Sequence, residues 1–312
     1  MANTIPAGLQ NNIISQSALE AFTKKLAPLQ AFSTSFNDEA TRRGKTINVT
    51  TLANTSSAAN FAAATGYAAQ DTVYATSEIS LTNHKYCTWH VTDTQAAQSS
   101  AVELERFGYQ KGGDLADAVF QDILTEVTVA NYGDAAGFTG AASTFDGDDV
   151  ADLRGDMVDE NCPPEQCALV IGNDYYTNLL KDGDISGYFD YGSADIIRDG
   201  RIPSLFGVGF IFSTASIPTN SENLIGFIAH PSAMAVAMRY LEPTNTQEYI
   251  AANRLYDEDS GMVLGYREFY DAKLGVQTAV LEAVYGFKVG ISGALRRMIS
   301  ASVSYTHLTL PT

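Results

Sequence analysis

Positive charge is scarce in this sequence. Lys and Arg together number 19 among 312 residues, against 36 Asp and Glu, which leaves a formal net charge of −17 at pH 7. Because nucleic acid is itself a polyanion, an acidic chain has no general electrostatic attraction for it. The composition therefore argues against a protein that binds DNA and reads its sequence.

Long apolar runs are missing as well. The chain has no run of about 18 apolar residues, the length that crosses a membrane as a helix. Its first residues, MANTIPAGLQNN, lack the basic and apolar regions of a secretory signal. We therefore expect a soluble protein of a cytoplasm, with no membrane partner. Apolar residues still make up 45% of the chain, which is enough to fill a large globular core.

Cysteine is rare too, with only Cys87, Cys162 and Cys167. These residues form neither an even disulfide framework nor a Cys-x-x-Cys pair, so we expect free thiols. Cys87 lies between His84 and His90 in the manner of a metal cluster, but alternate side chains of a strand face opposite sides. Both histidines would share one face while Cys87 points away, so the sequence predicts no metal site here.

Other partial motifs are incomplete. Asp182 and Asp184 open a calcium-loop pattern in which Ser193 replaces the closing glutamate, so we expect a turn. The Gly-x-Gly that begins at Gly207 has Phe212 in place of a third glycine, so no dinucleotide site is expected.

The remaining acidic and histidine features have structural interpretations. Four aspartates crowd residues 146–152, where carboxylates favour the start of a helix. His230 has no sequence-local nucleophile beside it, and we expect a hydrogen-bonded core or interface histidine. With no hydrolase, metalloprotease or phosphate-loop motif in the chain, we expect no enzyme, no cofactor and no metal.

The first third of the chain indicates a helix followed by a long hairpin. A polar arm leads into an amphipathic helix with Leu19, Phe22 and Leu26 on one face, which Pro28 should end. Period-two patterns before residue 53 and over residues 72–92 then predict two strands. The stretch 53–70 between them carries Ala, Ser and Thr around Phe61 and Tyr67, and we interpret it as a loop that lies on a neighbouring subunit. The alternative is a flexible Ala/Ser-rich linker.

The middle of the chain predicts helices and then a mixed α/β region. One helix should cover residues 101–109 and break at Gly112 and Gly113, and a second should restart at Asp114 with an apolar stripe. Further helices are expected at 150–160, 173–183 and 231–240, and strands at 167–172, 202–213, 222–230 and within 262–290. The last strands should rejoin the long helix and the hairpin, so that one domain is inserted into another.

Residues 303–312, VSYTHLTLPT, correspond to the translation of a common sequencing-library adapter. We therefore interpret this decapeptide as a non-native tail and exclude it from fold reasoning. The alternative is a native polar strand.

Three stretches carry a family resemblance: ADIIRDGRIPSLFGVGFIFSTASIP, NLIGFIAHPSAMAVAMR and GYREFYDAKLGVQTAVLEAVYGFKVG. With the order of arm, low-charge hairpin, long helix and α/β insertion, the chain resembles the major capsid protein of tailed bacteriophages, of the Hong Kong 97 type. The resemblance implies an α+β fold with an N-terminal arm at 1–34, an extended hairpin or E-loop at 35–91, a peripheral domain with a long spine helix at 92–132 and 239–302, and an axial domain at 133–238. The residues that would contact neighbouring subunits are Phe61, Tyr67, Tyr74, Glu103, Glu105 and Arg106.

The resemblance also implies a function and partners. The chain would self-assemble through hexamers and pentamers into an icosahedral shell around double-stranded phage DNA, in a virion assembled in the bacterial cytoplasm with a portal protein. Since no lysine lies between Lys45 and Lys85, covalent crosslinking of the hairpin is not expected. Only a helix precedes the hairpin, so a separate scaffolding protein is expected. The alternatives are an encapsulin-type nanocompartment shell and a secreted adhesin.

Overall fold

The computed structural model describes residues 7–34, 46–53, 61, 67, 73–94, 101–133, 136–183, 200, 202, 204–245, 247–257 and 261–300. Within these ranges, the side chains of residues 7–14, 48–53, 73–77 and 101–105 are outside the description. The tail at 303–312 and most of the calcium-loop pattern, from Asp184 to Ser193, also lie outside the described residues.

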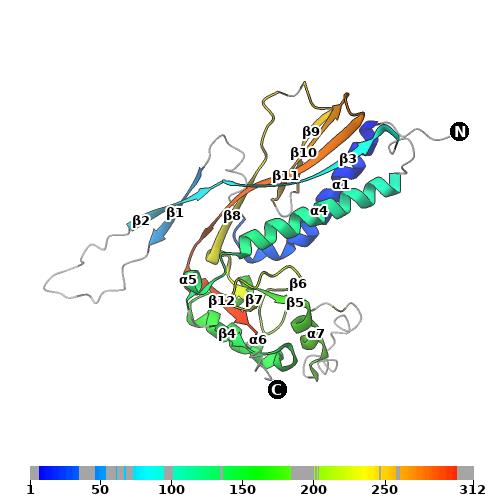
Figure 1. Ribbon diagram of the computed structural model, residues 1–312. Coiled ribbons are helices and arrows are strands. Elements are labelled where there is room, and N and C mark those ends of the chain that lie inside the picture. Colours follow the sequence, from blue (N-terminus) through cyan, green and yellow to red (C-terminus); the bar gives the residue numbers. More distant parts are fainter. Residues whose placement is uncertain are drawn as a thin grey trace, which may run out of the picture.

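Two five-stranded sheets form the framework of the molecule (Figure 1). The first, here called the β11 sheet, has the order β3-β11-β10-β9, with β8 also paired to β11. Its strands are β3 (Asn83–Thr92), β8 (Met234–Arg239), β9 (Ala251–Tyr256), β10 (Val263–Asp271) and β11 (Val276–Val289). The pairing of β11 with β3 confirms that the late strands rejoin the early part of the chain.

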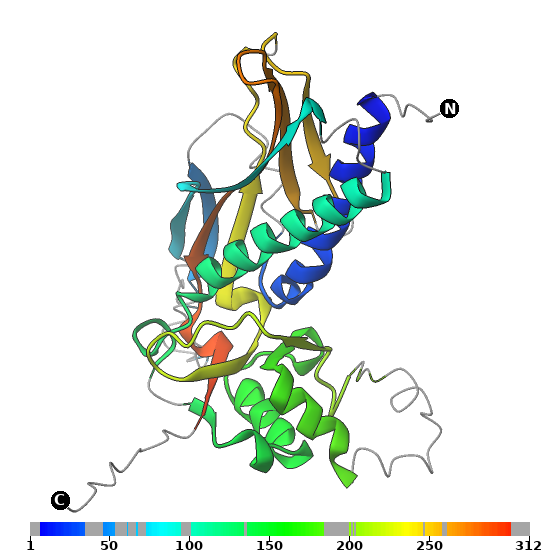
Figure 2. The ribbon, with the colours of Figure 1, turned by 45° about the vertical axis from the view of Figure 1, so that its right-hand side comes forward.

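Two long helices, α1 (Ala7–Leu26) and α4 (Ala101–Leu124), lie together against one face of the β11 sheet (Figure 2). The expected apolar stripe of α4 is buried at Leu115, Val119 and Ile123. It packs with Phe22 and Leu26 of α1 in the main core, so these two helices and the sheet bury a common set of side chains.

The predicted break at Gly112 is wrong, because α4 runs through it without interruption. A Cβ atom on Gly112 would lie 2.2 Å from the backbone oxygen of Ala18. The glycine therefore allows the close approach of α1 to α4, and the packing outweighs its poor helix propensity. The expected end at Pro28 is confirmed, since α1 stops at Leu26 and a 3₁₀ turn, η1 (Ala27–Ala31), follows.

The second sheet, here called the β7 sheet, has the order β4-β12-β7-β5-β6. Its strands are β4 (Ala136–Thr139), β5 (Ala168–Gly172), β6 (Phe210–Thr214), β7 (Leu224–Ala229) and β12 (Leu295–Ile299). Helices α6 (Gly147–Asp159) and α7 (Asn173–Lys181) pack against it, as the α/β interpretation predicted (Figure 1). The short helices are α5 (Val129–Tyr132), η2 (Ala142–Thr144), η3 (Pro164–Gln166), η5 (Pro231–Ala233) and η6 (Ser292–Ala294).

The acidic cluster at 146–152 begins α6, as expected. The side chain of Asp146 accepts from the backbone N–H groups of Asp148 and Asp149, and the Asp149 carboxylate accepts from the Asp146 N–H in return. This reciprocal capping satisfies N–H groups that have no partner inside the helix. The cluster is therefore a helix start.

The predicted helix at 231–240 is wrong, since this segment is η5 followed by strand β8. β8 pairs with β11, and Ser33 bonds to it through Met234 and Val236. Ala237 is buried where the hairpin meets the β11 sheet. The small residues thus serve close sheet packing, which overrides the helix propensity of alanine.

The hairpin consists of β1 (Thr46–Ala53) and β2 (Val73–Ser80), which pair antiparallel as predicted. The second expected strand, 72–92, is divided at Leu81 and Thr82, because β3 leaves the hairpin and enters the β11 sheet. Sheet membership also differs from the expected domain limits at two other strands. β8 lies in the β11 sheet, and β12 lies in the β7 sheet between β4 and β7.

Candidate assembly surfaces

The hairpin stands on a small apolar cluster separate from the main core. This hairpin foot consists of Ile47, Ile79 and Leu81, which pack with Ala237 of β8 and Val284 of β11. Beyond the foot, β1 and β2 extend away from the body as a two-stranded sheet (Figure 1). A strand pair alone is marginally stable in water, so contact with another molecule would stabilise this hairpin.

Two aromatic side chains mark the loop of the hairpin. The ring centroids of Phe61 and Tyr67 lie 4.8 Å apart. Their exposed fractions are 61% and 91%, so the pair is formed in solvent without burial against the rest of the chain. Tyr74, the third hairpin candidate, lies opposite Leu52 in β2, and its side chain is outside the described residues. The structure thus brings two of the three together.

Three of the predicted subunit-contact residues lie near the start of α4, and the structure describes the side chain of one of them. Glu103 and Glu105 lie in the first turns of the helix, but their side chains are outside the description. Arg106 is exposed. Its neighbours Phe107 and Tyr109, which sequence reasoning missed, are 45% and 46% exposed. Their position just before the buried stripe begins is the signal that could have found them.

The face of the β11 sheet away from the helices carries a charged cluster. Glu282 Oε1 forms an ion pair with Arg267 Nη2 at 2.6 Å, and Glu282 Oε2 lies 3.1 Å from His84 Nε2. The Arg267 guanidinium also lies over the ring of Tyr249, while Tyr86 on the same face is 64% exposed. Both carboxylate oxygens of Glu282 lie close to a nitrogen of a basic side chain, so the cluster is a structural ion pair with little exposure to solvent.

The histidines and cysteines have structural environments. His84 and His90 point to the exposed side of β3 and Cys87 to its inner side, as the alternation predicted. His90 Nδ1 lies 2.9 Å from the Thr278 hydroxyl. Among the described residues, no group of three or more His, Cys, Asp or Glu side chains is placed to hold a metal ion. All three cysteines are free thiols, and burial raises the pKa of Cys167 to about 12.

His230 is hydrogen-bonded on both ring nitrogens, as expected. Its Nδ1 accepts from the Ser232 N–H at 3.3 Å, so the proton of the neutral ring lies on Nε2, 3.0 Å from Gln166 Oε1. Burial lowers the pKa of the imidazole below its usual 6.5. The ring therefore serves the connection between β7 and η5 as a neutral hydrogen-bonding group.

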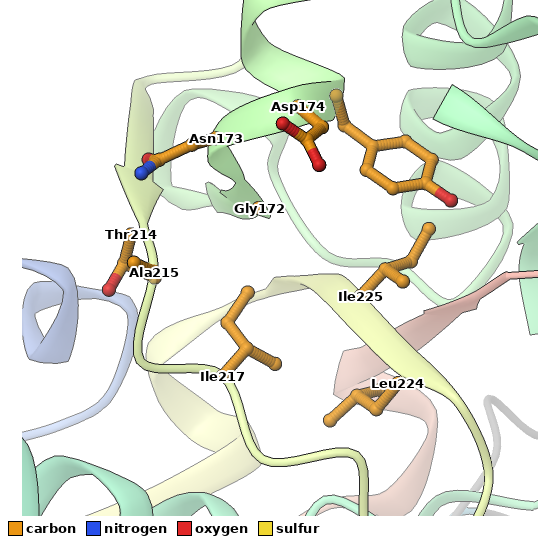
Figure 3. A pocket seen from close by; sticks show the side chains of 9 residues that line it. Gly172, Asn173, Asp174, Thr214, Ala215, Ile217, Leu224 and Ile225 are labelled. Carbon is orange, nitrogen blue, oxygen red and sulfur yellow. The ribbon is translucent and has the colours of Figure 1, made fainter. Parts of the chain in front are cut away.

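A shallow hollow lies where β5 and β6 end and α7 begins (Figure 3). Its volume is about 400 Å³, and Ile217, Leu224 and Ile225 face Asn173 and Asp174 across it. Asp174 already places a carboxylate in the first turn of α7, where it favours the helix dipole. The described lining also holds two hydroxyl groups, those of Tyr175 and Thr214.

The described part of the chain contains no helix that is both long and apolar enough to cross a membrane. The sequence matches no protein-family model and no curated protein.

Solved structures of viral shells, in contrast, match most of the chain. The capsid of cyanophage P-SCSP1u superimposes with a TM-score of 0.58 at 14% identity, covering 87% of this chain and 86% of that one. The mature capsid of bacteriophage PhiM1 gives 0.54 at 12% identity over 87% and 85%. The chain has the fold of phage major capsid proteins.

The same capsid fold is found in a virus-like particle from Pyrococcus furiosus. That structure matches with a TM-score of 0.51 at 14% identity, covering 92% of this chain and 98% of that one. The family resemblance of the sequence is thereby confirmed at the level of the fold, including its mixture of helices and strands.

Proposed function

We propose that this chain is a structural major capsid protein, whose copies assemble into an icosahedral shell around the double-stranded DNA of a phage. The observation that carries the proposal is the hairpin, which extends from the body on a small foot and exposes the Phe61–Tyr67 pair. The similarity of the fold to solved phage capsids supports the proposal.

In the proposed mechanism the hairpin lies on a neighbouring copy. Among the described strands, β1 and β2 pair with each other alone, and contact with a second molecule would bury the exposed loop aromatics. Each contact is weak, but many contacts per copy add up across a closed symmetric assembly. The proposed contact residues remain Phe61, Tyr67, Tyr74, Glu103, Glu105 and Arg106, and the exposed Phe107 and Tyr109 join them.

The proposal includes partners and a place of assembly. Copies would form hexamers and pentamers, with a separate scaffolding protein and a portal protein, in the host cytoplasm. The DNA would be enclosed without sequence-specific binding, because the net charge of −17 gives it no general attraction. No catalytic step, cofactor or metal is part of this function.

The first experiment removes the hairpin loop. We would express the chain with residues 53–70 replaced by a short Gly/Ser linker and compare its particles with those of the parent chain by sizing chromatography and negative-stain microscopy. We expect a folded subunit that forms no closed shells. Shells of normal size and yield from this variant would contradict the proposed contact between the hairpin and a neighbouring copy.

A second pair of variants isolates the aromatic rings. Phe61→Ser with Tyr67→Ser removes both rings and should reduce shell yield at least tenfold. The matched control, Phe61→Tyr with Tyr67→Phe, keeps both rings and should assemble like the parent. Equal yields from the two pairs would show that the rings do not carry the contact.

The alternative is a cellular shell compartment of the encapsulin type, which the match to the Pyrococcus furiosus particle favours. Both functions require the same shell, so the contents distinguish them. Particles purified from the native source should hold nuclease-protected DNA if the capsid proposal is right. Protein cargo in its place would establish the compartment.

A further inference from the structure

The turn that enters β7 contains unusual backbone. Asn220, Ser221 and Asn223 have φ angles of 49°, 59° and 54°, in the left-handed region. That region costs a residue other than glycine roughly 1–2 kcal/mol, and Asn tolerates it better than Ser. Such a conformation persists where surrounding contacts stabilise it, and the side chains of this turn make contacts with two other segments of the chain.

Asn220 closes the end of the long helix. Its Nδ2 donates to the backbone oxygens of Leu124 and Val127, both at 2.8 Å. Carbonyl groups in the last turn of a helix have no partner within the helix itself. The amide of a residue next to the β7 sheet thus supplies the cap of α4, which belongs to the β11 side of the molecule.

Glu222 holds the next segment of the chain. Its carboxylate accepts from the Val129 N–H, at the start of α5, at 3.0 and 3.3 Å. It also pairs at 2.6 Å with Arg297 of β12, whose side chain is only 2% exposed. The second Nη of Arg297 donates to the Gly133 oxygen at 2.8 Å. The connection from α4 to β4 is therefore held at both ends by side chains of the β7 sheet and its turn.

We infer that Asn220, Glu222 and Arg297 are positioning residues that fix the β7 sheet against the end of α4 and so set the curvature at which copies join. The inference rests on the proposed function. A buried ion pair contributes little net stability compared with apolar packing, but it restricts which arrangement of its segments is allowed. A change of angle within the subunit is repeated at each contact between copies, so it alters the shell that closes.

The test exploits two asparagines in the same neighbourhood. Asn220→Asp keeps the size of the side chain and its tolerance for the left-handed region, but it replaces the donor with a charge that repels two carbonyl groups. The matched control is Asn131→Asp. Asn131 Nδ2 donates to the backbone oxygen and to a carboxylate oxygen of Glu126, so this substitution also removes an amide donor, but at a site whose hydrogen bonds stay within residues 126–131.

Two measurements are made on each variant: hydrogen–deuterium exchange of residues 124–133 in the dissociated subunit, and the diameter distribution of assembled particles. For Asn220→Asp we expect at least tenfold faster exchange and a shifted or broadened distribution. For Asn131→Asp we expect parental diameters. If Asn220→Asp does not fold, Asn220→Gly carries the same test, because glycine removes the amide without strain.

Parental diameters for the Asn220 variant, or equal shifts for both asparagines, would overturn the inference. Failure of the parent chain to form any particle would instead contradict the proposed function. In that case the exchange measurement still decides whether Asn220 holds the end of α4.

Discussion

A single missing methyl group sets the distance between the two long helices. Gly112 lies within α4, where its absent Cβ would overlap the backbone of Ala18 in α1. The backbone of α1 cannot yield as the end of a flexible side chain could. The sequence pattern predicted a helix break at this glycine, because helix propensity reports only on neighbouring residues. The close approach of α1 comes from a distant part of the sequence and gives no signal around Gly112.

Substituting alanine at Gly112 should therefore destabilise the fold, although alanine is the better helix former. We expect a loss of about 1–3 kcal/mol in the free energy of unfolding, as for other overpacked sites. Gly155→Ala is the control, since nothing lies within 4 Å of a Cβ at that helical position. It should gain about 0.5–1 kcal/mol. Urea denaturation measures both, and equal effects would contradict the close-approach explanation.

His230 should make stability fall in mildly acidic solution. Its pKa is lowered below 6.5 by burial, so as pH falls the unfolded chain takes up the proton first. The contribution of His230 to the free energy of unfolding is fully present above pH 6.5. It declines as the pH falls through that value and stops declining below the pKa of the folded state. His230→Gln should show a smaller decline between pH 7.5 and 5.5 in thermal unfolding. A pH profile that the substitution leaves unchanged would refute this assignment.

At the scale of elements, the start of α6 can be tested directly. Asp146→Ala removes the acceptor for two backbone N–H groups and should cost about 1 kcal/mol. Asp148→Asn, at an exposed position in the same first turn, keeps the cap and serves as the control. Chemical denaturation compares the two variants. A larger loss for Asp148→Asn would mean that charge near the helix dipole, not capping, stabilises this start.

The hairpin should loosen when its foot is trimmed. Ile79 is 1% exposed in a cluster of few side chains, so Ile79→Ala should cost about 2–4 kcal/mol of local stability. Amide exchange in β1 and β2 should then quicken while α4 keeps its protection. Glu78 is exposed on the same strand, so Glu78→Ala is the control and should leave amide exchange unchanged. Loosening of α4 together with the hairpin would show that the foot belongs to the main core.

Sequence patterns predicted some elements well and others badly, for identifiable reasons. The α4 stripe has strong periodicity, and the strands near residues 168 and 224 are nearly continuous apolar runs, so each signal lies within one segment. β8 has no such signal, because its alanines and methionines suit a helix equally well. Its pairing with β11 makes this segment a strand. Of the assembly candidates, composition and low charge led to Phe61 and Tyr67, whereas the turn at Asn220 has no signal beyond its asparagines.

At the scale of the whole molecule, the two sheets are interleaved along the chain. The chain passes from the β11 side to the β7 sheet after α4, returns at β8, and enters the β7 sheet again at β12. A division into sequence intervals cannot describe this arrangement, because β8 and β12 each pair with strands from a distant part of the chain. Boundaries read from composition mark loops, but they do not report which sheet a strand joins.

The position of β12 has a consequence for synthesis. Within the β7 sheet, β4 pairs only with β12, which begins at Leu295 in a chain of 312 residues. On the ribosome, β4 emerges long before this partner exists, so the β4 edge of the sheet can form only after β12 has been synthesised. Until β12 has emerged, Arg297 cannot pair with Glu222, so the contact between the turn before β7 and β12 also forms late in synthesis.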